Sequence, residues 1–385
     1  MVEAVRAGDS LRQVAARFGV SLPTVQRWVA RAGEQRLDRV VWSDRPCGLP
    51  TPVNRTERSL EDLVLTIRQQ LRQTSDLGEF GAAAIHGELV ARGIADPPSI
   101  RTIGAILQRR GALDYHRRVR RPPPPAGWYL PAVADGRAEL DSFDIVEGLA
   151  LQGGHQVEVL NGVSLHGGLP VSWPVAAPVT AKMTVTSLLE HWREVGLPHY
   201  AQFDNDMIFQ GTHRYPDALG RVIRACLSLD VTPVFVPLTE MGFQAAIESY
   251  NGWWQARVWL RFRHASVADL CDRSGRHVTA LRRHRRARLE ASPERRPFPA
   301  GWKLNLQAMP QGRLIYLRRA DGRGGVVVLG QRWQVSENWP HRLVRVEVDL
   351  TEKRLRFYTL RRRDPKSQPL VLDVPYHLPQ RRFQE

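Results

Sequence analysis

Between residues 136 and 264 the chain alternates strand-like and helix-like segments, and this alternation limits the possible folds more than any other feature. The runs AELDSFDIVEG and HYAQFD have strand character, whereas AKMTVTSLLEHWREV, DALGRVIRACLSL and GFQAAIESYNGWWQARVWLRF show helical periodicity. Strands that alternate with helices favour parallel pairing within one sheet. The central part of the chain is therefore predicted to be an α/β domain.

The N-terminal segment SLRQVAARFGVSLPTVQRWVARA, residues 10–32, contains two helical apolar patterns that are broken at Gly19. Ser10 and Ser21 are suited to cap the two helices, which predicts a helix-turn-helix. The residues expected to face DNA from the second helix are Thr24, Gln26, Arg27 and Arg31. The alternative is an ordinary helical hairpin that makes no contact with DNA.

Two further regions are rich in arginine. LEDLVLTIRQQLRQ, AAAIHGELVARG and SIRTIGAILQRRG predict three amphipathic helices, and the last of these carries Arg101 in what resembles a second helix-turn-helix. The segment around ALRRHRRARLE has little apolar content and is expected to follow a DNA backbone, although a solvated helix face is the alternative. Its candidate DNA-binding residues are Arg282, Arg283, Arg285 and Arg286.

The C-terminal region, residues 300–385, contains the short alternating runs RLIYLRRA, GVVVLG, QRWQVS, RLVRVEVDL and RLRFYTLRR. Five short strands separated by Gly, Asn or Asp turns predict a small β-barrel. The chain is thus expected to be a multidomain protein. The predicted parts are a helix-turn-helix domain (1–36), a linker (37–57), a second helical DNA-binding domain (58–115), a basic Pro-rich linker (116–136), an α/β catalytic domain (137–265), an Arg-rich linker (266–299) and the barrel (300–385).

The formal net charge of +16 favours a polyanionic partner such as nucleic acid, although a basic surface can also be merely solvated. The three cysteines lie far apart and form no CxxC pair, so neither a disulfide framework nor a zinc ribbon is indicated. No apolar run approaches the roughly 18 residues of a membrane span. We therefore expect a cytoplasmic protein without a membrane partner.

Three acidic residues stand out in the α/β region: Asp141 in its first strand, Asp204 after a later strand, and Glu248 on the long helix. Carboxylates gathered at one edge of a sheet repel each other unless cations neutralise them. Oxygen ligands favour Mg²⁺ or Mn²⁺, and two such ions can activate a nucleophile and stabilise the leaving oxygen of a phosphodiester. Asp144 is the alternative for the first position, because residues three apart on a strand point to opposite faces.

Four motifs in order carry a family resemblance: ELDSFD, LNGVSLHGGLPVSWPV, VTSLLEHWREVGLPHYAQFDND and AAIESYNGWWQARV. They resemble the DDE transposases and retroviral-type integrases, the integrase-core family of bacterial insertion elements, over roughly residues 137–265. The resemblance implies an RNase H-like domain with two metal ions held by Asp141, Asp204 and Glu248. It also implies that Asn251 and Gln255 touch DNA. The chain departs from the family where Asp206 replaces a glycine and where GTHRYPDALG lengthens the interval before Glu248.

The resemblance implies a transposase that cleaves transposon ends and transfers the strands into target DNA. Its expected partners are the terminal inverted repeats, the target DNA and further copies of the chain, in a dimer or higher multimer associated with the bacterial nucleoid. Two alternatives remain: a catalytically inactive or domesticated derivative that acts as a DNA-binding regulator, and a nuclease without strand transfer. Trp253 and Trp254 are expected to pack in the core or in an interface rather than to stack on bases.

Overall fold

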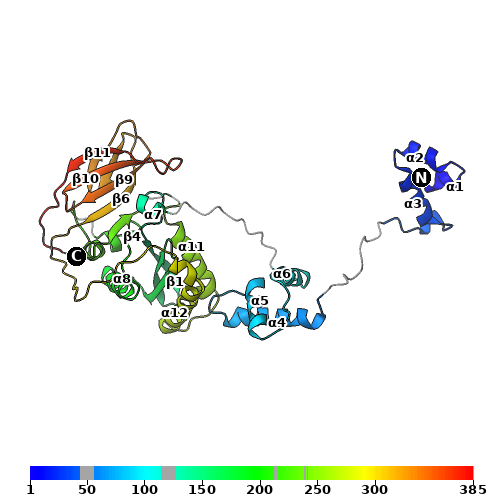
Figure 1. Cartoon of the computed structure of the whole chain (residues 1–385), viewed down its shortest axis with the longest axis horizontal. Coiled ribbons are helices and arrows are strands. Elements are labelled where there is room, and N and C mark those ends of the chain that lie inside the picture. The colour runs from blue at the N-terminus through cyan, green and yellow to red at the C-terminus, as the bar shows by residue number, and fades with distance from the viewer. Residues whose placement is uncertain (44–55, 114–126, 212–214, 238–239, 241, 385) are drawn as a thin grey trace. The chain divides into compact units, whose positions relative to one another are not determined.

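The computed structural model describes residues 1–43, 56–113, 127–211, 215–237, 240 and 242–384. The chain divides into two compact units, Met1–Leu60 and Glu61–Glu385 (Figure 1). Most of the predicted linker at 37–57 and of the basic connector at 116–136 lies outside the described residues, as does part of the inserted segment GTHRYPDALG.

The N-terminal unit is built from helices around a small apolar core. Its elements are α1 (Val2–Arg6), α2 (Leu11–Phe18), α3 (Leu22–Ala32) and the 3₁₀ turn η1 (Leu37–Arg39). Ser10 caps α2 through a capping box with Gln13, and Gly19 takes the left-handed conformation that ends the helix (φ 64°). Val14 and Val25 are fully buried where α2 meets α3. The predicted pair of helices at 10–32 is confirmed.

The second unit begins with the three helices that the sequence predicts after Ser59. They are α4 (Arg58–Thr74), α5 (Ala82–Ala91) and α6 (Ile100–Arg109). Ile67, Ile85 and Ile103 are fully buried among them. No helix in the described ranges is long and apolar enough to cross a membrane.

The rest of this unit is organised around one mixed sheet. Among the described residues, nine strands follow the order β11-β10-β9-β6-β5-β4-β1-β2-β3. These strands are β1 (Leu140–Ala150), β2 (Gln156–Ser164), β3 (Pro170–Ala176), β4 (Tyr200–Phe203), β5 (Thr232–Phe235), β6 (Arg313–Arg319), β9 (Leu343–Asp349), β10 (Arg354–Leu360) and β11 (Leu370–Pro375). Strands β1, β4, β5 and β6 pair in parallel, and the flanking strands are antiparallel.

The helices of this part connect and cover the strands. They are α7 (Pro131–Ala134), α8 (Ala181–Val195), α9 (Met207–Gln210), α10 (Arg221–Ser228), α11 (Ala245–Trp254), the π-helical turn η2 (Gln255–Trp259), α12 (Val267–His284) and α13 (Arg286–Glu290). The predicted order of first strand, hairpin, helix, second acidic strand and glutamate helix is confirmed by β1, β2–β3, α8, β4 and α11.

The predicted separate C-terminal β-barrel is not confirmed for the described residues. Strand β6 pairs in parallel with β5, and β9, β10 and β11 extend the same sheet outward (Figure 1). Only β7 (Gly325–Val328) and β8 (Gln331–Gln334) form a separate hairpin among the strands described. The reason is visible in β6, where successive residues are buried on both faces as in a central strand, not on one face as in a small barrel wall.

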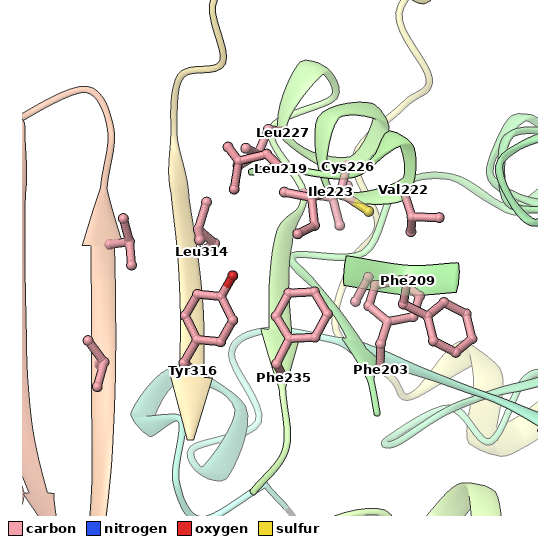
Figure 2. Packing of buried hydrophobic residues seen from close by; sticks show 14 of the residues in the cluster. Phe203, Phe209, Leu219, Val222, Ile223, Cys226, Leu227, Phe235, Leu314 and Tyr316 are labelled. Atoms are coloured by element: carbon pink, nitrogen blue, oxygen red, sulfur yellow. The ribbon is translucent and has the colours of Figure 1, made fainter. Parts of the chain in front are cut away.

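The sheet is packed on both faces. On one face aromatic rings of neighbouring strands stack in a row, with ring centroids 6.1 Å apart for Phe203 and Phe235 and 5.1 Å apart for Phe235 and Tyr316 (Figure 2). Helix α10 covers this row with Val222 and Ile223, both fully buried. This packing holds β1, which contains Asp141 and Asp144, beside β4, which Asp204 follows.

Two predicted linkers are also part of the folded unit. Helices α12 and α13 occupy most of the range 266–299 that was expected to be an Arg-rich linker. Helix α12 lies along β3, and its buried residues Leu270 and Leu281 pack with residues of β1, β2 and α11. In the basic connector, Trp128, Tyr129 and Leu130 are buried against β5 and β6. Burial of these apolar side chains explains why both predicted linkers belong to the folded unit. The high Arg and Pro content of the two segments hides this apolar content in the sequence.

Candidate active site

Strand β1 presents its two aspartates to opposite faces of the sheet. Asp141 lies on the same face as Phe143, which packs with Trp192 of α8 at a centroid distance of 6.3 Å. Asp144 lies on the face that carries Leu140 and Ser142 and is covered by α11. The period of two residues along a strand makes this separation unavoidable.

Asp141 is held in a buried ion pair and does not lie with the other predicted ligands. Arg295 donates to both of its carboxylate oxygens, with Nη1 3.1 Å from Oδ2, and the Trp192 indole N–H donates to Oδ2 at 3.1 Å. The Asp141 side chain is 2% exposed. Because its charge is already neutralised by a guanidinium, Asp141 does not need a metal ion to be buried. The preference for Asp141 over Asp144 is therefore at odds with the structure.

Asp144 instead lies on the face covered by α11, within reach of the charges of the other two acidic residues. The pKa of Asp144 is raised to about 6, chiefly by burial, then by the negative charge of Asp204 and least by that of Glu248. The Asn251 side-chain amide donates to Asp144 Oδ2 at 2.7 Å and orients the carboxylate. Charges at the end of β4 and on α11 thus act on Asp144 of β1.

The stretch after β4 explains the extra aspartate in QFDNDMIFQ. The Asp206 backbone N–H donates to Asp204 Oδ1 at 3.0 Å, and the Asp206 carboxylate accepts from the Ile208 N–H at 2.7 Å. Asp206 is therefore the N-cap of α9, which accounts for a carboxylate at the position where the resembling family has glycine. Asn205 donates to the Val236 carbonyl at 2.6 Å and ties this turn to the end of β5.

One further acidic residue belongs to this surface and was missed from the sequence. The pKa of Asp204 is raised, first by burial and then by the charges of Asp206 and Glu147. Glu147 is exposed and follows Asp144 by three residues on β1. A β-bulge between Val146 and Leu149 interrupts the alternation of faces there. The position of Glu147 beside Asp204 therefore could not be predicted from regular strand periodicity.

The donor set is oxygen-only, which suits a hard divalent cation. Within the described ranges, however, no group of three or more His, Cys, Asp and Glu side chains already stands close enough to hold a metal ion. Glu248 is exposed on α11, whereas Asp144 and Asp204 are half-buried. The uncompensated charge on Asp144 nevertheless matches what a bound cation would neutralise.

The raised pKa of Asp144 has a consequence for stability. Its folded-state pKa of about 6 exceeds the usual 3.8, so the folded protein holds this proton more tightly than the unfolded chain does. The stabilising contribution is complete below the usual value and is lost as the pH rises through about 6. We expect thermal melts of the metal-free protein to show this loss, and the Asp144→Asn variant to lack it. Parallel pH profiles of the two proteins would contradict the assignment.

The predicted DNA-binding residues fall into two groups. Exposed side chains remain available for a ligand, and they are Gln26, Arg27, Arg101, Arg283 and Arg286, the last also paired with Glu290. The second group makes contacts within its own unit. Thr24 bonds Ser21, Arg31 reaches the Ser43 carbonyl, Arg282 binds Glu194 and the Pro170 carbonyl, and Arg285 donates to the Gly168 carbonyl.

Asn251 and Gln255, which were predicted to touch DNA, are both partly buried within their own unit. The Asn251 amide is shared between Asp144 and Asn161, whose Nδ2 donates to Asn251 Oδ1 at 2.9 Å. Gln255 is half-buried and opens the π-helical turn η2. Asn251 therefore supports the acidic site from within, which the sequence spacing to Glu248 does not reveal.

A cavity of about 300 Å³ lies between the start of α11 and the strands β1 and β4, where Ser142 and Gln202 line it. Arg285 and Arg288 reach it from the C-terminal helices. Burial lowers the pKa of Arg285 to about 10, and the nearby charge of Arg288 lowers it as well. Trp253 lines the cavity and is 43% exposed, whereas Trp254 is fully buried, so the expectation of packing is confirmed only for Trp254.

Comparison with known proteins identifies one part of the chain. Residues 1–39 match the homeodomain-like domain family. No curated protein matches the chain. Among solved structures, a chain from the simian T-cell lymphotropic virus intasome in complex with the PP2A regulatory subunit B56 gamma is 14% identical, with a TM-score of 0.34, and the match covers 79% of this chain and 95% of that one.

A second solved structure is the catalytic core domain of BIV integrase. It is 15% identical with a TM-score of 0.28, and the match covers 37% of this chain and 80% of that one. TM-scores below 0.5 do not assign this chain a function. The chain carries an N-terminal homeodomain-like module and a large mixed α/β domain in which the charges of Asp204 and Glu248 act on Asp144.

Proposed function

We propose that the protein is a DNA transposase of the DDE type, in which Asp144, Asp204 and Glu248 bind two Mg²⁺ or Mn²⁺ ions. The observation that carries the proposal is geometric: β1 pairs in parallel with β4, which Asp204 follows, and Asn251 of α11, the helix of Glu248, donates to Asp144 at 2.7 Å. When bound, such ions supply positive charge that activates the attacking water or 3′ hydroxyl and stabilises the leaving oxygen. The order of motifs along the chain supports the same assignment.

The side chains of this site have separate tasks in the proposal. Asn251 holds the Asp144 carboxylate in one orientation, and the Asp206 backbone N–H does the same for Asp204. Glu248 is exposed, so its side chain is free to turn toward the other two when a cation enters. This movement reconciles the proposal with the absence of a preformed cluster among the described residues.

DNA would be held by modules outside the acidic site. The homeodomain-like module would read the terminal inverted repeats through Gln26 and Arg27, and the second helical module would add Arg101. Exposed arginines such as Arg283 would contact backbone phosphates of end or target DNA, which makes binding strongly salt-dependent. Because two transposon ends must be joined in one reaction, we propose a dimer or higher multimer.

Replacing Glu248 by glutamine is expected to lower cleavage of end DNA by at least about 100-fold, because the site loses a negatively charged ligand for the cations. DNA binding, measured by gel shift without divalent ions, is expected to stay near that of the unmodified protein. Glu190→Gln is the matched control, since Glu190 is also an exposed helical glutamate, on α8. Undiminished cleavage by Glu248→Gln would remove Glu248 from the site.

The second candidate function is a DNA-binding regulator derived from a transposase, which the lack of a preformed metal cluster among the described residues favours. A Mg²⁺-dependent strand-transfer assay on the matching terminal repeats separates the two functions. Joined products support the transposase, and cleavage without joining indicates a nuclease. Binding without any cleavage indicates the regulator.

A further inference from the structure

A buried hydrogen-bond network lies directly beneath the acidic site. Ser142 Oγ donates to Gln202 Oε1 at 2.9 Å, and Gln202 Nε2 donates to the Tyr129 hydroxyl. The Tyr129 hydroxyl donates in turn to the Phe243 carbonyl at 3.2 Å. Tyr129, Ser142 and Gln202 are each at most 2% exposed and line the cavity described above, so these bonds satisfy their buried polar groups.

Each member of the network sits next to an element that carries a carboxylate. Ser142 and Gln202 are partners in the β1–β4 ladder, and they precede Asp144 and Asp204 by two residues each. Residues two apart on a strand share a face, so each lies beside the following acid. Phe243 lies at the entry to α11, the helix that carries Glu248. The Tyr129 hydroxyl therefore joins the two acidic strands to the start of the glutamate helix.

Tyr129 is itself fixed by the C-terminal strands. Arg345 of β9 donates to the Tyr129 carbonyl at 3.1 Å, and Gln368 donates to the neighbouring Trp128 carbonyl at 3.0 Å. The Tyr129 ring also packs against Phe243 with a centroid distance of 5.1 Å. Contacts from the C-terminal region therefore hold Tyr129, the residue that connects the elements of the site, in place.

We propose that Tyr129 is a positioning residue that sets the spacing of Asp144, Asp204 and Glu248 for their cations; this inference rests on the proposed function. Residues that orient metal ligands change metal affinity by about 10- to 100-fold when they are replaced. A phenylalanine at this position keeps the ring but leaves Gln202 and the Phe243 carbonyl without this partner. The entry to α11 is then free to shift relative to the strands.

The test measures two quantities on the full chain: the Mn²⁺ concentration at half-saturation in isothermal titration calorimetry without DNA, and the Mn²⁺ concentration that gives half-maximal cleavage of end DNA. Tyr129→Phe is expected to raise both concentrations about 10-fold or more, with excess Mn²⁺ restoring much of the cleavage rate. The matched control is Tyr376→Phe, which also removes a buried tyrosine hydroxyl, one that donates to Asp217 at 2.7 Å. The control is expected to keep the Mn²⁺ dependence of the unmodified protein, whatever its melting temperature.

The outcomes separate this inference from the proposed function. An unmodified protein that cleaves at no Mn²⁺ concentration would overturn the function itself. If it cleaves, and Tyr129→Phe shows an unchanged Mn²⁺ dependence or a loss that excess Mn²⁺ does not recover, the positioning role is overturned alone. Should Tyr129→Phe not fold, Ser142→Ala tests the same network at its far end and is expected to shift the Mn²⁺ dependence in the same direction.

Discussion

The Asp144→Asn variant is expected to lose DNA cleavage by at least about 100-fold and yet to melt a few degrees higher than the unmodified protein without metal. The loss follows because the amide no longer offers a charged ligand. The gain follows because the ionised Asp144 carboxylate is disfavoured in the folded state, by burial first and by Asp204 second. Asparagine still accepts the hydrogen bond from Asn251, so packing is retained.

Calorimetry with and without Mn²⁺ checks both halves of this prediction. Mn²⁺ is expected to raise the melting temperature of the unmodified protein and to leave that of Asp144→Asn nearly unchanged, because a ligand stabilises only a state that binds it. Asp272→Asn is the matched control, since Asp272 is an exposed aspartate on α12 that pairs with Arg276 and has no place in the proposed site. Cleavage at the ordinary rate by Asp144→Asn would exclude Asp144 as a ligand.

The Asp141→Leu variant is expected to have the opposite signature, a free energy of unfolding lower by about 3–5 kcal/mol. The Arg295 side chain is 12% exposed and would be left as a buried charge without its partner. Its bond to the Gly196 carbonyl does not neutralise it. Urea unfolding measures the loss directly, and the shift in midpoint is expected without a change in the slope.

Replacing both partners distinguishes an ion pair from a metal site. The double variant Asp141→Leu with Arg295→Met is expected to recover much of the stability, because a well-packed apolar pair often replaces a buried ion pair at little cost. Both variants are expected to keep the Mn²⁺-induced rise in melting temperature. A stable Asp141→Leu protein that no longer responds to Mn²⁺ would return Asp141 to the site.

The order of secondary-structure elements could be predicted from the sequence because each has its own local signal. The capping pattern at Ser10 and the apolar periodicity of α11 depend only on neighbouring residues. The choice between Asp141 and Asp144 could not be made in this way. Strand periodicity shows that they face opposite sides, but the partner that neutralises Asp141 is Arg295, 154 residues away.

The C-terminal region illustrates the same limit on a larger scale. The run RLIYLRR predicts a strand, yet its parallel partner β5 lies about eighty residues earlier, and no local pattern specifies this pairing. The packing of the Arg-rich segment was not predicted because the segment has few apolar residues. Two of these, Leu270 and Leu281, are nevertheless buried. Asn251 was predicted to touch DNA, and its bond to Asp144 depends on how α11 crosses β1.

The most direct test is anomalous diffraction at the manganese edge from crystals of the protein bound to end DNA and Mn²⁺. The account predicts manganese peaks bounded by the carboxylates of Asp144, Asp204 and Glu248, with a backbone phosphate beside them, while Asp141 stays paired with Arg295. Manganese bound by Asp141, or no manganese near Asp144 in a complex that has cleaved its DNA, would contradict the assignment.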